Sequence, residues 1–206
     1  MSFTYKGKSF SIERYPKSEN RALKAWSTAD EHILNYIVEN NISFNKPIVY
    51  NDRFGFLSTI LSGQQPSTVI NFKSQEKALE INLSNHGIDL NNISKVSPLD
   101  KPETSFDLAL IKIPKSLELF RMQLDQVHRS LDENAIVVCG FMTKYFSRKI
   151  LDIADDYFEQ CEQSKAWKKS RLLILKKKKN VEKQELINTI PFTDTKNFYI
   201  YITYIL

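Results

Sequence analysis

Thiols and long apolar stretches are both scarce in this sequence of 206 residues. The two cysteines, Cys139 and Cys161, form no Cys-x-x-Cys pair and have no histidine beside them, so neither a zinc site nor a disulfide framework is expected. No apolar run approaches the roughly 20 residues that a membrane-spanning helix needs, and the N-terminal MSFTYKGKSF has no apolar signal segment. We therefore expect a cytoplasmic protein with no metal and no membrane partner.

The excess of positive charge is small. The 29 Lys and Arg residues exceed the 24 Asp and Glu residues, which gives a formal net charge of +5. This excess permits a polyanionic partner such as RNA without requiring one. Hydrophobic residues make up 42% of the chain and charged residues 26%, a balance typical of a globular domain that can bury a core.

Short apolar segments alternate with amphipathic segments in the middle of the chain. The apolar segments predict strands at residues 47–50, 67–72, 93–96, 106–113 and 135–141. The amphipathic segments predict helices at residues 53–62, 74–84, 116–131 and 145–157. Such alternation is typical of a parallel sheet with right-handed crossovers, so we predict an α/β fold.

The segments on either side of this alternation differ from it. Residues 1–16 predict a β-hairpin, and residues 20–40 predict a helix. Residues 158–164 and 170–176 predict an antiparallel hairpin at the edge of the sheet. A mostly parallel sheet that ends in such a hairpin is typical, by analogy, of the Rossmann-like S-adenosylmethionine methyltransferase fold.

The chain is expected to hold one domain and a tail. The domain spans residues 1–179, and its α/β core occupies residues 46–176. Residues 180–206 stay unassigned, as a tail or as the start of a linker, although residues 198–206 (FYIYITYIL) are apolar and rich in β-forming residues.

Four separated segments, in order along the chain, carry a resemblance to one family. They are residues 21–34 (RALKAWSTADEHIL), 50–55 (YNDRFG), 110–119 (LIKIPKSLEL) and 166–173 (AWKKSRLL). Together they resemble the N-terminal domain of bacterial ribosomal RNA (guanine-N2)-methyltransferases, within the methyltransferase small-domain superfamily. The sequence is more similar to the large-subunit enzyme than to its small-subunit relative, over roughly residues 20–176.

This resemblance implies two methyltransferase-like domains in tandem. In that family the C-terminal domain carries S-adenosylmethionine and the chemistry, whereas the N-terminal domain is a degenerate duplicate that helps to hold RNA. The present sequence would be that first domain, with no cofactor of its own and with ribosomal RNA and the C-terminal catalytic domain as partners. Residues 180–206 do not match the family's continuation, which a truncation or a reading-frame change would explain.

The turn after the first core strand lacks the residues of a cofactor site. A Rossmann-like methyltransferase needs a glycine-rich turn there, because the backbone must approach the cofactor at a helix N-terminus. Residues 51–55 read NDRFG, so Gly55 is the one glycine of the turn. We expect Arg53 and Phe54 to fill the space that a cofactor would use.

Two further positions depart from the pattern of an active enzyme. The second strand should be followed by a carboxylate that binds the ribose hydroxyls, but residues 71–74 read NFKS, and Glu76 lies inside the predicted helix. Enzymes that methylate an exocyclic amine use an Asn-Pro-Pro-aromatic turn after the fourth strand, where the Asn accepts a hydrogen bond and the ring stacks on the extruded base. Residues 112–115 read KIPK, so only Pro114 is kept.

We therefore predict that this chain alone has no catalytic residue and no cofactor-binding residue. The degenerate positions are Asn51, Asp52, Gly55, Lys112 and Pro114. No other catalytic set is evident in the sequence, since the three histidines lie on separate predicted elements, namely His32, His86 and His128.

Basic residues with aromatic neighbours are the candidates for RNA contact. They are Lys144, Arg148, Lys149, Lys165, Trp167, Lys168, Lys169, Arg171, Lys176 and Lys177. Cations beside aromatic rings suit phosphate contact combined with base stacking. The alternative is that these lysines form the solvated face of an edge strand, where they block aggregation. A second basic group is expected at the carboxyl ends of the strands, as a phosphate site or a solvated rim: Arg53, Lys73, Lys112 and Lys115.

Three functions stay open at this point. A non-catalytic, RNA-recognising and structural half of an rRNA guanine-N2 methyltransferase predicts salt-dependent RNA binding without cofactor binding. An active methyltransferase with divergent motifs predicts saturable binding of S-adenosylmethionine. A protein-interaction scaffold that pairs with a separate catalytic domain predicts a tight complex with that domain and no affinity for RNA.

Overall fold

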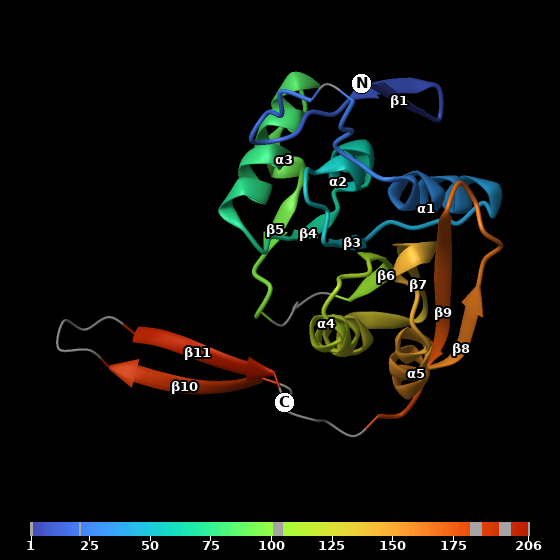
Figure 1. Cartoon of the computed structure of the whole chain (residues 1–206), viewed down its shortest axis with the longest axis vertical. Coiled ribbons are helices and arrows are strands. Elements are labelled where there is room, and N and C mark those ends of the chain that lie inside the picture. Colours follow the sequence, from blue (N-terminus) through green and yellow to red (C-terminus); the bar gives the residue numbers. More distant parts are fainter. Residues whose placement is uncertain (1, 21, 101–104, 182–186, 194–198, 206) are drawn as a thin grey trace.

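A computed structural model describes residues 2–20, 22–100, 105–181, 187–193 and 199–205 (Figure 1). Its centre is a seven-stranded sheet in the order β5-β4-β3-β6-β7-β9-β8. The strands are β3 (Pro47–Tyr50), β4 (Ser67–Val69), β5 (Ser94–Val96), β6 (Phe106–Lys112), β7 (Leu131–Met142), β8 (Phe158–Gln163) and β9 (Ser170–Lys178). The helices are α1 (Thr28–Glu39), α2 (Phe56–Ile60), α3 (Lys73–Asn85), α4 (Leu117–Ser130) and α5 (Arg148–Tyr157). The predicted α/β fold is confirmed.

The strands β5, β4, β3, β6 and β7 are parallel, and β9 pairs antiparallel with both β7 and β8. The terminal antiparallel strands are therefore confirmed, but β9 lies inside the sheet and β8 forms its edge. We call the side where the parallel strands end the carboxyl edge, and the opposite side the amino edge. Since Ser170 pairs with Met142, β9 begins at the carboxyl edge.

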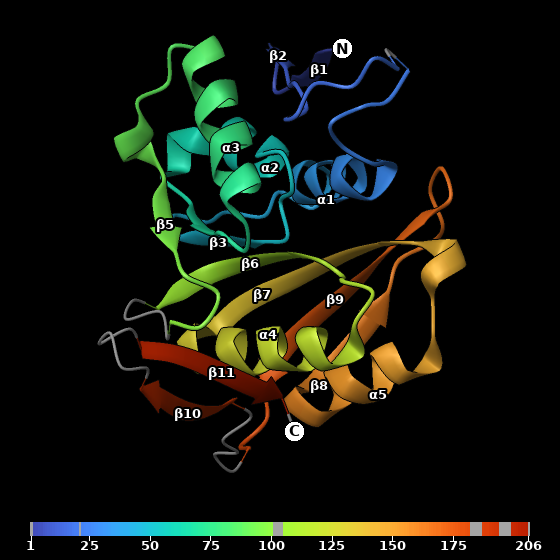
Figure 2. The ribbon, with the colours of Figure 1, turned by 60° about the vertical axis from the view of Figure 1, so that its left-hand side comes forward.

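Helices cover both faces of the sheet, with α1, α2 and α3 on one face and α4 and α5 on the other (Figure 2). Alternate strand residues feed two cores, as the period of a strand requires. Val49 and Val138 pack with Leu34 of α1, whereas Ile48 and Cys139 pack with Leu124 of α4. The all-apolar centre of β7 is thus buried on both sides, in agreement with its sequence.

The helix predicted over residues 20–40 is shorter than expected, because it begins at Thr28. Ser27 caps it in a capping box with Asp30, and such a box marks a helix start. The preceding segment is irregular and mostly exposed, but Ala25 and Trp26 are buried, and the ring of Trp26 stacks on Phe56 at a centroid distance of 4.9 Å. The apolar residue Trp26 fitted the helical spacing of the sequence, but it is buried by packing of an irregular segment and not by lying on a helix.

Other boundaries also moved. The helix predicted at residues 53–62 is the short α2, which begins after Gly55, and a 3-10 turn follows at Ser62–Gln64. The strand predicted at residues 67–72 ends at Val69, whereas β7 begins at Leu131, before its predicted start at residue 135.

Two hairpins lie outside the main sheet. The predicted N-terminal hairpin is β1 (Ser2–Tyr5) paired with β2 (Lys8–Ser11). In the tail, β10 (Ile187–Thr193) pairs with β11 (Tyr199–Ile205) as a separate antiparallel ribbon. Within the described ranges, no helix is long and apolar enough to cross a bilayer.

Candidate functional site

The carboxyl edge of the sheet is hollowed by a cavity of about 920 Å³. Its walls come from the start of α1, from the turns after β3, β4 and β6, and from the end of β7 with the turn that follows. Open α/β sheets bind their ligands at this edge, so the sequence directed attention to the correct region. The turns after β3, β4 and β6 determine which side chains line the cavity.

The turn after β3 begins with a clasp of side-chain amides. Asn51 has a left-handed backbone, with φ of 60°. Its Nδ2 donates to the Lys112 carbonyl and to Gln123 Oε1, both at 2.8 Å, while Gln123 Nε2 donates back to Asn51 Oδ1 at 3.0 Å. This amide clasp ties β3 to β6 and to α4. The degenerate position Asn51 therefore has a structural role.

Asp52 points into the protein rather than toward the cavity. Its Oδ2 accepts hydrogen bonds from the backbone and the hydroxyl of Ser58, both at 2.8 Å, and Thr68 donates to the same hydroxyl. Burial raises the pKa of Asp52, and the bonds from Ser58 oppose that shift. The side chain is one of the buried polar groups and does not line the cavity.

Gly55 closes the same turn at φ of 73°, a left-handed conformation that favours glycine. An added Cβ would lie 2.9 Å from Leu79 Cα, so the position also has no room for a side chain. The glycine thus serves close packing of α2 on α3.

Of the two residues expected to fill the space of a cofactor, Arg53 lines the cavity and Phe54 does not. Phe54 is buried in the core on the α1 side, beneath the guanidinium of Arg14, and it does not reach the cavity. The expectation was wrong for Phe54, because this ring faces α1 and α2. Arg53 does line the cavity and is exposed.

The turn after β4 brings an aromatic ring to the cavity. Phe72 is 70% exposed, although it is apolar, and it lines the cavity. Glu76 turns away and pairs with Lys73 and with Lys95, and these bonds lower the pKa of Glu76 to about 2. Glu76 is absent from the cavity's walls, as is Lys73.

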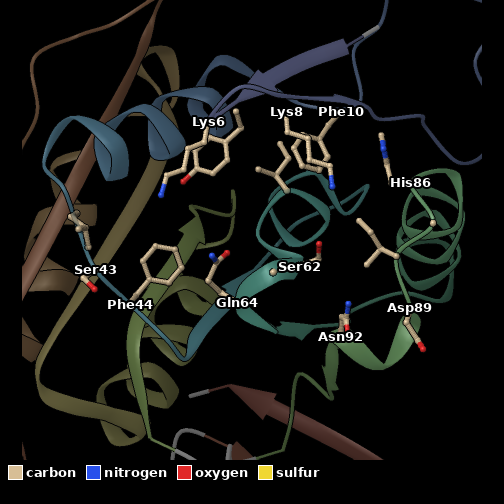
Figure 3. A pocket seen from close by; sticks show the side chains of 16 residues that line it. Lys6, Lys8, Phe10, Ser43, Phe44, Ser62, Gln64, His86, Asp89 and Asn92 are labelled. Carbon is tan, nitrogen blue, oxygen red and sulfur yellow. The ribbon is translucent and has the colours of Figure 1, made fainter.

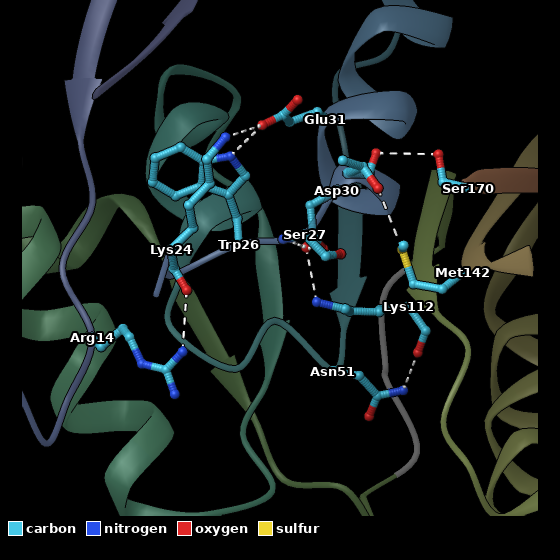
Figure 4. A network of polar contacts seen from close by, with 11 residues as sticks. Arg14, Lys24, Trp26, Ser27, Asp30, Glu31, Asn51, Lys112, Met142 and Ser170 are labelled. Atoms are coloured by element: carbon cyan, nitrogen blue, oxygen red, sulfur yellow. Dashed lines mark hydrogen bonds and ion pairs between the residues drawn. The ribbon is translucent and has the colours of Figure 1, made fainter. Parts of the chain in front are cut away.

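The end of β6 is tied to the start of α1 (Figure 4). Lys112 Nζ lies 2.8 Å from Asp30 Oδ2, and the same oxygen accepts hydrogen bonds from the backbone and the hydroxyl of Ser27 at 2.7 Å. Asp30 is 2% exposed, so this carboxylate depends on its partners. Lys112, the first residue of the KIPK turn, thus holds a helix cap in place.

The charge of the cavity's walls is of one sign. The charged residues that line it are Arg53, Lys112 and Lys115, and no carboxylate is among the described lining residues. Lys112 is neutralised by Asp30, whereas Arg53 and Lys115 have no acidic partner within the part of the chain that the structure describes. Such walls attract anions and repel cations.

The basic residues predicted to contact RNA are divided between two edges. Lys144, Lys165, Lys168 and Lys169 are exposed at the carboxyl edge, where Thr143 N donates to the Lys169 carbonyl at 2.9 Å. Lys176 and Lys177 lie toward the amino edge, because β9 runs antiparallel to β7.

Two of the three remaining basic candidates have partners. Arg148 pairs with Asp152 on α5, and Arg171 donates to Gln163 on β8. Lys149 is exposed in the first turn of α5. None of these three lines the carboxyl-edge cavity within the described structure.

The turn between β8 and β9 has an unusual backbone. Trp167 and Ser170 exchange both backbone hydrogen bonds, and between them Lys168 and Lys169 have φ of 46° and 64°. Such a two-residue turn favours Asn-Gly, so two lysines there are strained. Thr28 Oγ1 of α1 donates to the Lys168 carbonyl at 3.1 Å and helps to hold this lysine turn, defined by Lys168 and Lys169.

A second cavity, of about 750 Å³, lies at the amino edge (Figure 3). The hairpin of β1 and β2 forms one wall, and the loops after α1, α2 and α3 form the others. Its charged lining residues include Lys6 and Lys8 but also Asp89.

The cavities and the exposure of Phe72 were not predicted from the sequence. A phenylalanine in the polar run NFKS, just after a short strand, was the available signal for an exposed ring. The cavity itself depends on the packing of five separate loops, which no local pattern reveals.

Related sequences are known. The chain matches the RLMG N-terminal domain family over residues 1–180. The protein "Ribosomal RNA large subunit methyltransferase G" of Aliivibrio fischeri (strain MJ11) is 32% identical over 170 residues, which cover 81% of this chain and 44% of that protein. The chain therefore spans less than half the length of such relatives.

Solved structures show the same fold. A T. thermophilus 16S rRNA N2 methyltransferase in complex with AdoMet and guanosine aligns with a TM-score of 0.62 at 12% identity, covering 100% of this chain and 52% of that one. The N-methyltransferase NodS from Bradyrhizobium japonicum WM9, in complex with S-adenosyl-l-homocysteine, aligns with a TM-score of 0.58 at 9% identity, covering 73% and 86%. The predicted S-adenosylmethionine methyltransferase fold is confirmed, and the chain belongs to the RLMG N-terminal domain family of ribosomal RNA large subunit methyltransferases.

Proposed function

We propose that this chain is the non-catalytic, RNA-binding half of a cytoplasmic rRNA guanine-N2 methyltransferase, in which a separate C-terminal domain holds S-adenosylmethionine. The observation that carries the proposal is the charge of the carboxyl-edge cavity, whose walls include Arg53 and Lys115 without a described acidic partner and no described carboxylate, while Lys112 is neutralised by Asp30 behind the wall. A sulfonium cofactor is itself positively charged at its reacting atom, so these walls oppose its binding. The ribose hydroxyls would also lack the carboxylate that grips them in active enzymes.

Three residues in the turns after β3 and β6 support this proposal because they already have partners. Asn51 and Gln123 bond to each other, Asp52 bonds to Ser58, and Lys112 pairs with Asp30. Each of these contacts would have to break before the side chain could turn toward a ligand. Buried polar groups that lose their partners cost about 1–3 kcal/mol each.

The proposed RNA contacts are the exposed lysines of the same edge. Lys144 and the lysine turn have no acidic partner within the described residues, and the ring of Trp167 lies below Lys168 at 4.4 Å. Cations of this kind neutralise phosphates and release counterions, so the affinity should fall steeply with salt.

Calorimetric titration tests the cofactor half of the proposal. Full-length chain titrated with S-adenosylmethionine should give no saturable heat, whereas an active methyltransferase with divergent motifs would give one. Saturable binding would overturn the proposal.

A salt titration tests the RNA half, with a single-stranded fragment of ribosomal RNA. The triple variant Lys144→Gln, Lys168→Gln, Lys169→Gln should reduce the slope of log affinity against log salt by about 2, since each lost phosphate contact contributes about 0.7. The double variant Lys176→Gln, Lys177→Gln, toward the amino edge, is the matched control and should change the slope less. Absence of RNA binding by the natural chain would instead favour the interaction scaffold.

A further inference from the structure

We propose that the carboxyl-edge cavity receives one unstacked base of single-stranded RNA, with that nucleotide's phosphates held at its rim. This inference rests on the proposed RNA-binding function and assigns the place where RNA is read. The occupant is a nucleotide because the cavity combines three features: apolar walls, exposed aromatic rings at the opening, and cations without described acidic partners.

The interior of the cavity suits a flat apolar surface. Pro114, Phe141 and Met142 line it, together with Ile113 and Leu117. The volume of about 920 Å³ lies within the range of about 300–1,000 Å³ that small-molecule sites occupy. A single nucleotide therefore fits, and a duplex does not.

Two exposed rings flank the opening. Phe72 is 70% exposed in the turn after β4, and Tyr145 is 51% exposed in the turn after β7. Because β3 and β6 lie between those strands, the rings lie on either side of the cavity. Exposed apolar rings beside a cavity are costly in water, but they are the surfaces on which unstacked bases lie.

The rim supplies cations close to one of these rings. Lys144 Nζ lies 4.8 Å and Lys115 Nζ 5.8 Å from the centre of the Tyr145 ring. Arg53 lines the cavity from the turn after β3. None of the three has an acidic partner in the described part of the chain, so their charges are available to phosphate. A base stacked on Tyr145 would place its own phosphate within reach of Lys115 or Lys144.

Removal of a ring should separate stacking from charge. Phe72→Ala and Tyr145→Ala should each weaken binding of single-stranded RNA about 5- to 100-fold, as loss of base–aromatic stacking does elsewhere. The salt slope should stay at its natural value, because neither ring carries charge. Phe72→Tyr should restore the affinity, since the ring is retained.

Leu90→Ala is the matched control. Leu90 is 48% exposed and lies toward the amino edge, after α3, so its loss should leave RNA affinity unchanged. The replaced side chains are exposed, and thermal unfolding should confirm that all variants keep the fold. An RNA that carries 5-iodouridine supplies a second readout, since photocrosslinking should give adducts on Phe72 or Tyr145.

The outcomes distinguish this inference from the proposed function. If the natural chain binds RNA with its full salt slope but the ring variants bind equally well and adducts form only elsewhere, the base site is wrong and the RNA-binding function stands. If the natural chain binds no RNA, both are wrong. If S-adenosylmethionine displaces the RNA from the cavity, the cavity is a cofactor site and both proposals are overturned.

Discussion

The two edges of one sheet are both hollowed, yet their chemistry differs. The carboxyl-edge cavity has basic walls without a described carboxylate and two exposed rings, whereas the amino-edge cavity combines Lys6 and Lys8 with Asp89. Both are lined by loops, so loop position alone does not explain the difference. The lining whose charged residues are all basic lies at the edge where open α/β sheets bind their ligands.

The lysines at the two edges also differ. At the amino edge, Lys178 Nζ donates to the Leu131 carbonyl at 2.6 Å, and Lys179 Nζ donates to the Asp155 carbonyl. At the carboxyl edge, the side chains of Lys168 and Lys169 are exposed on a strained turn. Strained backbone that the surrounding structure holds in place is found mostly at functional sites. Lys178 and Lys179 thus stabilise the amino edge, whereas Lys168 and Lys169 face solvent, as does Lys177 at the amino edge, whose φ of 56° is also left-handed.

The largest difference in the free energy of unfolding is expected between alanine substitutions of two glycines that both have a left-handed backbone, one at each edge. Gly55→Ala at the carboxyl edge should lower the free energy of unfolding by about 3 kcal/mol, since it adds a clash with the Leu79 backbone to the left-handed strain. Gly87→Ala lies at the amino edge with φ of 63° and open space, and should cost about 1 kcal/mol. Urea denaturation measures both, and equal losses would contradict the close packing at Gly55.

A smaller difference in the free energy of unfolding is expected between methionine substitutions of two lysines, Lys112 at the carboxyl edge and Lys178 at the amino edge. Lys112→Met should lower the free energy of unfolding by about 2 kcal/mol, because it leaves the buried Asp30 carboxylate with Ser27 as its hydrogen-bond partner. The loss is smaller than for a fully buried ion pair, because the Lys112 side chain is 33% exposed. Lys178→Met should cost about 1 kcal/mol, the value of one hydrogen bond to a carbonyl. Combining Lys112→Met with Asp30→Asn should recover part of the loss, and full additivity would show that the pair is not coupled.

The smallest effect should be a pH dependence shared by both edges. Burial lowers the pKa of His32, near the lysine turn, and of His128, near the amino edge, below the ordinary value of 6.5. As pH falls through 6.5 the unfolded chain takes up protons that the folded chain does not, so the free energy of unfolding decreases until the lowered pKa values are reached.

Histidine variants assign this pH dependence to an edge. His32→Gln and His128→Gln should each flatten the profile measured by thermal unfolding between pH 7 and pH 5 relative to the natural chain. His86→Gln, in the wall of the amino-edge cavity, serves as the control. A natural chain whose stability rises on acidification would contradict the predicted sign.

The sequence predicted the core strands and the terminal antiparallel strands well, since apolar runs such as AIVVCGF have few alternatives in a globular protein. The sequence wrongly predicted helix before Thr28, because Trp26 fits a helical spacing but is buried by stacking on Phe56 outside the helix. It also failed at the cavity, because Phe54 and Phe72 are equally apolar and only tertiary packing decides which ring is buried. The residues of the turns after β3 and β6 could be read from the sequence, but their hydrogen-bond and ion-pair partners Gln123, Ser58 and Asp30 could not.

The amide clasp between Asn51 and Gln123 limits which substitutions the turn after β3 tolerates. Asn51 joins β3, β6 and α4, so a substitution toward a glycine-rich turn would weaken the domain whatever it did for ligand binding. The same holds at Lys112, whose charge the buried Asp30 requires. Under the proposed function, loss of catalysis would therefore act as an evolutionary ratchet, in which each structural use of such a position makes reversion harder.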